Sequence, residues 1–173
     1  TVVRELGPVD VLVNNAGASP LYPSLDAVSE ALWDKVLDLN VYMNNSGGPI
    51  KKAVANKKAA ESLVVVHDEL DLPLGKVKIS YGSSAGGHKG VKSIEKALKT
   101  KDYVRVRVGI SGSTPSGKLK RPAPEKITDF VLGKFRPPEQ EKLKKARKTV
   151  GEALELIFAE GREVAQTQIN SRL

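Results

Sequence analysis

Short runs of β-branched residues alternate along this chain with longer segments of helical periodicity. The runs at 9–13, 63–66, 77–81 and 104–108 are apolar throughout or alternate apolar with polar positions, as strands do. Elsewhere apolar residues recur every three or four positions, which is typical of helices with one buried face. Strands separated by helices favour a layered domain. We therefore expect an α/β fold, a single three-layer sandwich with a mixed, mainly parallel sheet and helices on both faces.

The periodicity predicts helices at 24–39, 46–60, 91–98 and 138–160. The third follows a glycine-rich loop at 82–90. Gly161 should end the fourth, because glycine readily adopts the backbone conformation that follows helices. Residues 111–126 are rich in Gly, Ser, Pro and Lys, which predicts a mobile basic loop.

Positive charge is concentrated in the C-terminal three quarters of the chain. Lys and Arg outnumber Asp and Glu by 28 to 20, a net charge of +8. Residues 1–40 hold two basic and six acidic residues, so they carry −4 and the remainder carries +12. The asymmetry suggests two sequence histories and a polyanionic partner for the second part. From charge alone, a solvated basic face is an equally good interpretation.

The composition excludes several classes of site and location. The chain has no Cys, which excludes disulfides and thiolate metal sites and is typical of a reducing cytoplasm. It has no apolar run near the roughly 18 residues of a membrane span, and no signal-peptide pattern. With 40% hydrophobic and 28% charged residues, we expect a soluble cytoplasmic protein without a membrane partner.

Five motifs follow one another in the region 42–173. They are YMNNSG at 42–47, VHDELDLPLG at 66–75, GSSAGGHKGVKS at 82–93, YVRVRVG at 103–109 and FVLGKF at 130–135. Each alone would be a weak signal, but the order and spacing of all five resemble bacterial peptidyl-tRNA hydrolases. The resemblance implies hydrolysis of the ester between a peptide and the terminal ribose of tRNA, without a cofactor.

The resemblance assigns roles to residues of these motifs. Asp68 matches an Asp that orients a catalytic His, and Asn44 an Asn that positions the peptide. Such a carboxylate fixes the tautomer of an imidazole and stabilises the imidazolium. Met43, His88 and Lys89 match substrate-binding positions, although the family commonly has Asn in place of Lys89. From the residues alone, Asp68 could instead cap a turn, Asn44 could cap a helix and His88 could brace its loop.

The catalytic His of that family has no counterpart in this chain. The family carries it in an R-H-N-x-G segment after the first strand, and this segment is missing. The two His residues present, His67 and His88, match other family positions. On a strand, His67 would point away from Asp68, because successive side chains alternate between faces. We therefore expect hydrolysis to be impaired or absent.

Basic residues of the same region fit a tRNA partner. By resemblance, Lys78 and Arg107 hold tRNA phosphates, and Arg105 lies in the same motif as Arg107. Neutralising phosphates releases counterions and so favours binding. Without an aromatic platform for base stacking, recognition would be of the backbone and shape of the acceptor end. Further basic residues that could extend this patch are Lys92, Lys99, Lys101, Lys118, Lys120 and Arg121.

Residues 1–41 resemble a different family. The segment DVLVNNAG at 10–17 is similar to the D-x-LVNNAG element of short-chain dehydrogenases, and 33–41 fit the end of a helix in those enzymes. Their glycine-rich phosphate fingerprint and their Tyr-x-x-x-Lys pair are missing. We therefore expect no nicotinamide cofactor and no hydride transfer.

The join between these two resemblances predicts a chimera, engineered or recombined. Peptidyl-tRNA hydrolases begin with a strand and an N-P-G turn whose Asn is catalytic, and Asn15 could occupy that place. We expect the first strand to enter the hydrolase-like sheet, which makes 1–173 one domain, because a lone strand and helix cannot bury their apolar faces. The hairpin that precedes residue 42 in the family is lost, and a sheet edge left open would favour self-association. Two hypotheses follow: a hydrolase-like tRNA-binding protein, and a chimeric scaffold without selected activity.

Overall fold

Strands in the described part of the chain form one mixed sheet. A computed structural model of the chain describes residues 11–13, 36–38 and 45–173. The strand order is β2 (Val36–Asp38), β1 (Val11–Val13), β3 (Val64–Pro73), β5 (Val104–Ser113) and β4 (Val77–Tyr81), with β6 (Leu119–Lys120) paired to β5. β1 runs parallel to β2 and β3, and β3 runs parallel to β5. β4 and β6 are antiparallel to β5, so the expected mixed, mainly parallel sheet is confirmed.

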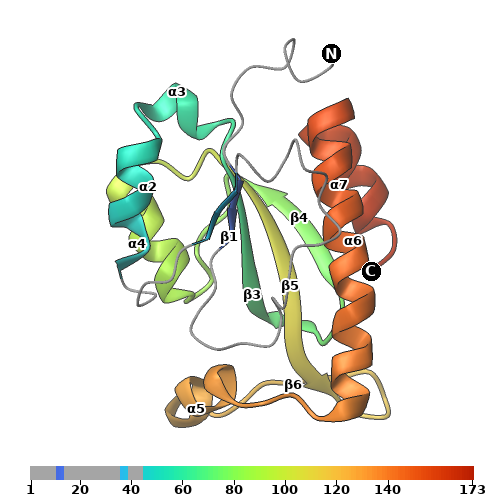
Figure 1. Cartoon of the computed structure of the whole chain (residues 1–173). Coiled ribbons are helices and arrows are strands. Elements are labelled where there is room, and N and C mark those ends of the chain that lie inside the picture. The colour runs from blue at the N-terminus through green and yellow to red at the C-terminus, as the bar shows by residue number, and fades with distance from the viewer. Residues whose placement is uncertain (1–10, 14–35, 39–44) are drawn as a thin grey trace.

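Helices cover both faces of this sheet (Figure 1). α2 (Gly47–Ala53) and α4 (Lys89–Leu98) lie on one side, and α6 (Pro137–Glu160) and α7 (Arg162–Asn170) lie on the other. α3 (Lys57–Ala60) precedes β3. The 3-10 helix η3 (Pro124–Lys126) leads into α5 (Ile127–Leu132), beyond the end of the sheet. None of the described helices is long and apolar enough to cross a membrane.

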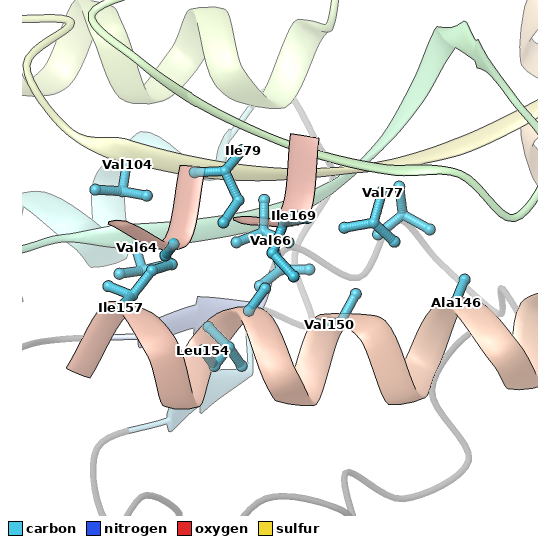
Figure 2. Packing of buried hydrophobic residues seen from close by; sticks show 14 residues of the cluster. Val64, Val66, Val77, Ile79, Val104, Ala146, Val150, Leu154, Ile157 and Ile169 are labelled. Atoms are coloured by element: carbon cyan, nitrogen blue, oxygen red, sulfur yellow. The ribbon is translucent and has the colours of Figure 1, made fainter. Parts of the chain in front are cut away.

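The alternation of β3 divides the apolar core between the two faces. Val64 and Val66 pack with side chains of α6 and α7, among them Leu154 (Figure 2). Val65 belongs to a second cluster that includes Ile94 of α4. Fully burying a side chain of this size stabilises a fold by about 1.5–3 kcal/mol. The central strand is therefore held between two apolar layers.

The first strand enters the sheet as expected. Val11 pairs with Val64 and Val13 with Val66, so β1 lies between β2 and β3. The expected helix end at residues 36–38 is wrong, because these residues form β2 and pair with β1. Pairing with a strand from elsewhere in the chain outweighs the local periodicity there. The other residues of the helix expected at 24–39 lie outside the described part of the chain.

The helix expected over 46–60 is two helices. α2 ends at Ala53, and Asn56 caps α3 by accepting a hydrogen bond from the Ala59 N–H over 2.9 Å. Asn side chains compete with the helical backbone for hydrogen bonds and therefore favour such caps. The spacing of apolar residues does not reveal a cap of this kind. α4 and α6 form in the expected segments, and α6 ends before Gly161, whose φ is 87°.

α7 covers the outer edge of the sheet at β4, and no helix is predicted there. The Asn170 side chain accepts the Ile79 N–H over 2.8 Å and donates to the Ile79 carbonyl over 2.9 Å. An additional strand would make the same pair of hydrogen bonds. The Arg162 guanidinium lies 3.6 Å from the centre of the Tyr81 ring, which fastens the start of the same helix. α7 therefore shields an edge that could otherwise pair with another chain.

Candidate active site

Acidic side chains gather along the C-terminal half of β3. Asp68, Glu69 and Asp71 follow the apolar run of this strand, where it pairs with β5. The glycine-rich loop returns to the same place, since a Cβ added to Gly86 would lie 3.9 Å from Asp71 Oδ2. Gly86 and Gly87 both have positive φ, which glycine adopts without strain. The loop thereby places the start of α4 beside the acidic residues of β3.

His88 is the imidazole partner of Asp68. Its Nε2 lies 3.0 Å from Asp68 Oδ1, and the two side chains are only 10% and 11% exposed. The same ring caps α4, because its Nδ1 accepts the Val91 N–H over 3.2 Å. A ring nitrogen that accepts carries no proton, so the proton of the neutral ring is on Nε2 and is donated to Asp68. Both ring nitrogens of His88 are therefore engaged.

The charge state of Asp68 follows from this partner. Burial acts to raise the pKa of Asp68, but its interaction with His88, chiefly the hydrogen bond, outweighs burial and holds the pKa below its usual value. Asp68 is consequently ionised at neutral pH and is a weak base there. Two predicted site residues, Asp68 and His88, thus lie together, and His88 both braces its loop and satisfies the carboxylate.

His67 lies beside this pair. Its ring makes an edge contact with the His88 ring, with 4.8 Å between centroids, and its Nδ1–H donates to the Asp68 carbonyl over 2.7 Å. Among the described residues its Nε2 has no hydrogen-bond partner. Alternation along β3 does not isolate His67 from Asp68, because His88 touches both. Burial lowers the pKa of His67 to about 3, so the ring is neutral at pH 7 and a poor base.

The three predicted tRNA-binding residues differ in their access to solvent. Arg107 and Lys78 are partly exposed and lie directly opposite each other in the β4–β5 register. Arg105 is only 2% exposed, which corrects the prediction that it binds tRNA. Its side chain lies near Glu95 of α4, and burial lowers the pKa of its guanidinium. A helix that covers this part of the sheet is the physical reason why Arg105 cannot reach a phosphate.

Glu69 is a site residue that the sequence analysis misses. Its Oε2 accepts a hydrogen bond from Arg107 Nε over 2.8 Å, and its Oε1 accepts the Asp71 N–H over 3.0 Å. The residue is buried. The available signal was the alternation of two neighbouring strands, which places Glu69 and Arg107 on the same face of the sheet.

The remaining predicted site residues fall in different places. Lys89 is exposed and is the first residue of α4. Asn15, Met43 and Asn44 lie outside the described residues. Within the described residues, no group of three or more His, Asp or Glu side chains is arranged to hold a metal ion.

Comparison with known proteins gives one consistent family. The family model for peptidyl-tRNA hydrolase matches residues 34–173. A peptidyl-tRNA hydrolase of Frankia casuarinae is 41% identical over 133 residues, which are 76% of this chain and 64% of that protein. The peptidyl-tRNA hydrolase 2 of Corynebacterium glutamicum is 36% identical over 168 residues, which are 94% of this chain and 76% of that protein.

Solved structures show the same fold. The crystal structure of peptidyl-tRNA hydrolase from Acinetobacter baumannii has a TM-score of 0.69 to this chain at 23% identity, and the match covers 96% of each chain. A complex of peptidyl-tRNA hydrolase with n-propanol gives a TM-score of 0.71, also at 23% identity, over 95% of each chain. The mixed sheet flanked by helices is therefore the fold of these structures.

Proposed function

The chain belongs to the peptidyl-tRNA hydrolase family, and we propose that it binds peptidyl-tRNA in the cytoplasm and hydrolyses the peptide ester only slowly. The hydrogen bond between His88 and Asp68 carries this proposal. It places an imidazole beside Asp68, the carboxylate to which the family resemblance assigns a catalytic role. In this orientation, however, the imidazole has no free lone pair.

Slow hydrolysis follows from the state of these two groups. Ester hydrolysis needs a base that takes a proton from the attacking water. The Nδ1 lone pair of His88 is used by the Val91 N–H, and its Nε2 proton is directed at Asp68. The Asp68 carboxylate is a second acceptor, but its lowered pKa makes it weakly basic at neutral pH, and the neighbouring His67 ring, with a pKa of about 3, is a poor base as well. Water can be activated by such a site, but inefficiently.

The remaining roles are proposed from the family resemblance. Asn44 positions the peptide, Met43 and Lys89 contact it, and Asn15 takes the place of the Asn in the family's N-P-G turn. An amide side chain donates and accepts hydrogen bonds but is not protonated at neutral pH. These residues can therefore hold substrate or water without supplying the missing base.

We propose that Lys78 and Arg107 bind phosphates at the acceptor end of tRNA. Both lie on the same face of the sheet, on neighbouring strands, close to the Asp68 region of β3. Two adjacent cations attract a polyanion more strongly than either alone, and they repel each other until one is compensated. Binding should weaken with salt, because each neutralised phosphate releases counterions.

Discharge of a purified N-acetylated aminoacyl-tRNA tests the proposed function. Asp68→Asn keeps the shape of the side chain but removes its charge, so slow turnover should fall by about tenfold or more while tRNA affinity stays unchanged. Arg107→Gln should do the opposite and weaken binding more than it slows turnover. Turnover that Asp68→Asn leaves unaltered would contradict the role of Asp68. Salt-independent tRNA binding would contradict the phosphate contacts.

We also propose that residues 1–41 are a dehydrogenase-like segment joined to a hydrolase-like remainder, in one domain spanning 1–173. The motif at 10–17 and the start of the family match at residue 34 support this origin. The Corynebacterium relative, which aligns over 94% of the chain, weighs against it.

Replacing residues 1–41 by the corresponding segment of the Corynebacterium relative tests the proposed chimera. A large gain in turnover supports the proposed chimera, because the core then needs only its missing segment. No gain contradicts it. Titration with a nicotinamide cofactor should give no saturable binding.

A further inference from the structure

The ion pair between Glu69 and Arg107 is largely enclosed, unlike the neighbouring pair of Arg121 and Asp71. The two side chains are 6% and 18% exposed, whereas the nearby pair of Arg121 and Asp71 is 50% and 40% exposed. Water screens an exposed pair so strongly that it changes the local field little. An enclosed pair at 2.8 Å compensates the charge of Arg107 much more completely.

The geometry of this pair leaves one side of the guanidinium open. Arg107 donates to Glu69 through Nε, and neither Nη nitrogen has a hydrogen-bond partner among the described residues. Glu69 is itself fixed, because its second oxygen accepts the Asp71 N–H. The negative charge is therefore held at one side of the arginine, and the two terminal nitrogens can still donate to an anion.

A fixed pair of opposite charges acts as a dipole, and this distinguishes distant from contacting anions. At long range the charges of Glu69 and Arg107 nearly cancel, so a phosphate that slides past is hardly attracted. A phosphate in contact with the Nη nitrogens is much closer to the cation than to the carboxylate and gains a charge-assisted hydrogen bond. Attraction is thus retained only for a phosphate brought into contact by the rest of a docked ligand.

We propose that Glu69 is a specificity-determining residue that suppresses the binding of generic polyanions at Arg107 while preserving the contact with a docked tRNA phosphate. This inference rests on the proposed function. Lys78, directly opposite Arg107 and without an ion-pair partner among the described residues, supplies the charge that attracts tRNA. Glu69 thus limits how strongly the local positive charge attracts nucleic acids that do not dock as tRNA does.

The test compares binding of tRNA and of a duplex DNA of similar length by the full chain, from about 50 to 200 mM salt. Glu69→Gln removes the carboxylate with little change in shape. Glu141→Gln is the matched control, since it adds the same net charge on α6, at an exposed pair with Lys144. The double variant Glu69→Gln/Arg107→Gln asks whether the effect passes through Arg107. Thermal unfolding checks that each variant is folded.

Glu69→Gln should tighten DNA binding severalfold at low salt and steepen the salt dependence by about one released counterion. Its tRNA affinity should change by less than about twofold, so the preference for tRNA falls. Glu141→Gln and the double variant should show neither change. An unaltered DNA affinity and salt slope in Glu69→Gln, or the same gain in Glu141→Gln, would overturn the inference. If Arg107→Gln alone leaves tRNA binding intact, the phosphate contact of the proposed function fails instead.

Discussion

Asp68 Oδ1 accepts a hydrogen bond of 3.0 Å from the Nε2 of His88, a residue twenty positions further along the chain. The same imidazole accepts the Val91 N–H and so caps α4. One side chain therefore holds both the carboxylate of the candidate site and the start of the helix beside it. His88 is therefore a structural residue as much as a site residue, and its cap of α4 and its contact with Asp68 can each be tested.

Removing the imidazole should cost stability through both of its contacts. His88→Ala loses the helix cap and leaves Asp68 without its partner, so the free energy of unfolding should fall by about 2–4 kcal/mol. His88→Asn keeps a good capping side chain and should recover about 1 kcal/mol of that loss. Urea denaturation of the two variants measures the difference. Equal stabilities would contradict a capping role for Nδ1.

Acidification should destabilise the fold through His67. Its pKa falls from 6.5 to about 3 on folding, so below pH 6.5 the unfolded chain takes up a proton that the folded protein does not. The contribution of His67 to the free energy of unfolding is fully present above pH 6.5. At pH 5 the free energy of unfolding should be about 2 kcal/mol lower. The lowered pKa of Asp68 acts only below its ordinary value of 3.8.

Urea midpoints at a series of pH values between 7 and 5 test this dependence. His67→Gln should flatten the profile, whatever its effect on the stability at pH 7. A wild-type slope that persists in His67→Gln would show that another group titrates.

A methyl group at Gly109 should distort β5 where it packs against β3. A Cβ there would collide with the Pro73 carbonyl oxygen and lie 2.8 Å from the Leu72 Cβ, so β5 could not approach β3 as it does. Gly109→Ala should therefore cost about 1–3 kcal/mol or more. Gly112→Ala is the matched control on the same strand, because a Cβ there meets nothing within 4 Å, and it should stay within about 0.5 kcal/mol of wild type. Similar losses in both variants would contradict the close packing at Gly109.

The edge of the sheet should open when Asn170 is replaced. Asn170→Ala removes both hydrogen bonds to Ile79 and should cost about 1–3 kcal/mol. It should also shift the protein towards dimers or larger species in analytical ultracentrifugation, because the freed backbone of β4 can pair with a second copy. Gln168→Ala, on the exposed side of the same helix, should do neither. A monomeric, fully stable Asn170→Ala would show that α7 does not protect this edge.

Sequence reasoning located Asp68 through the resemblance of VHDELDLPLG at 66–75 to a motif of peptidyl-tRNA hydrolases, and the β-branched run before it predicted the strand. It did not predict the partner of Asp68, since the turns at Gly86 and Gly87 decide where His88 falls. The assignment of Arg105 to tRNA was wrong because alternation shows which face a side chain takes, and not what covers that face.

Two elements escaped prediction because local patterns carry little information about them. β2 has three residues, too few to show a period of two, and it exists through pairing with β1. α7 buries only Ala165 and Ile169. Its place is fixed by Asn170 and Arg162, whose partners lie far away in the sequence.

The central claim is that hydrolysis is slow because the site lacks a free base, and chemical rescue tests it most directly. Turnover of peptidyl-tRNA is measured with increasing concentrations of free imidazole, for the wild type and for Asp68→Asn. The account predicts that imidazole accelerates the wild type in a saturable manner, and Asp68→Asn much less, because the carboxylate orients the added ring. Rapid turnover without imidazole that is abolished by His88→Asn would contradict it, since His88 would then be the base itself.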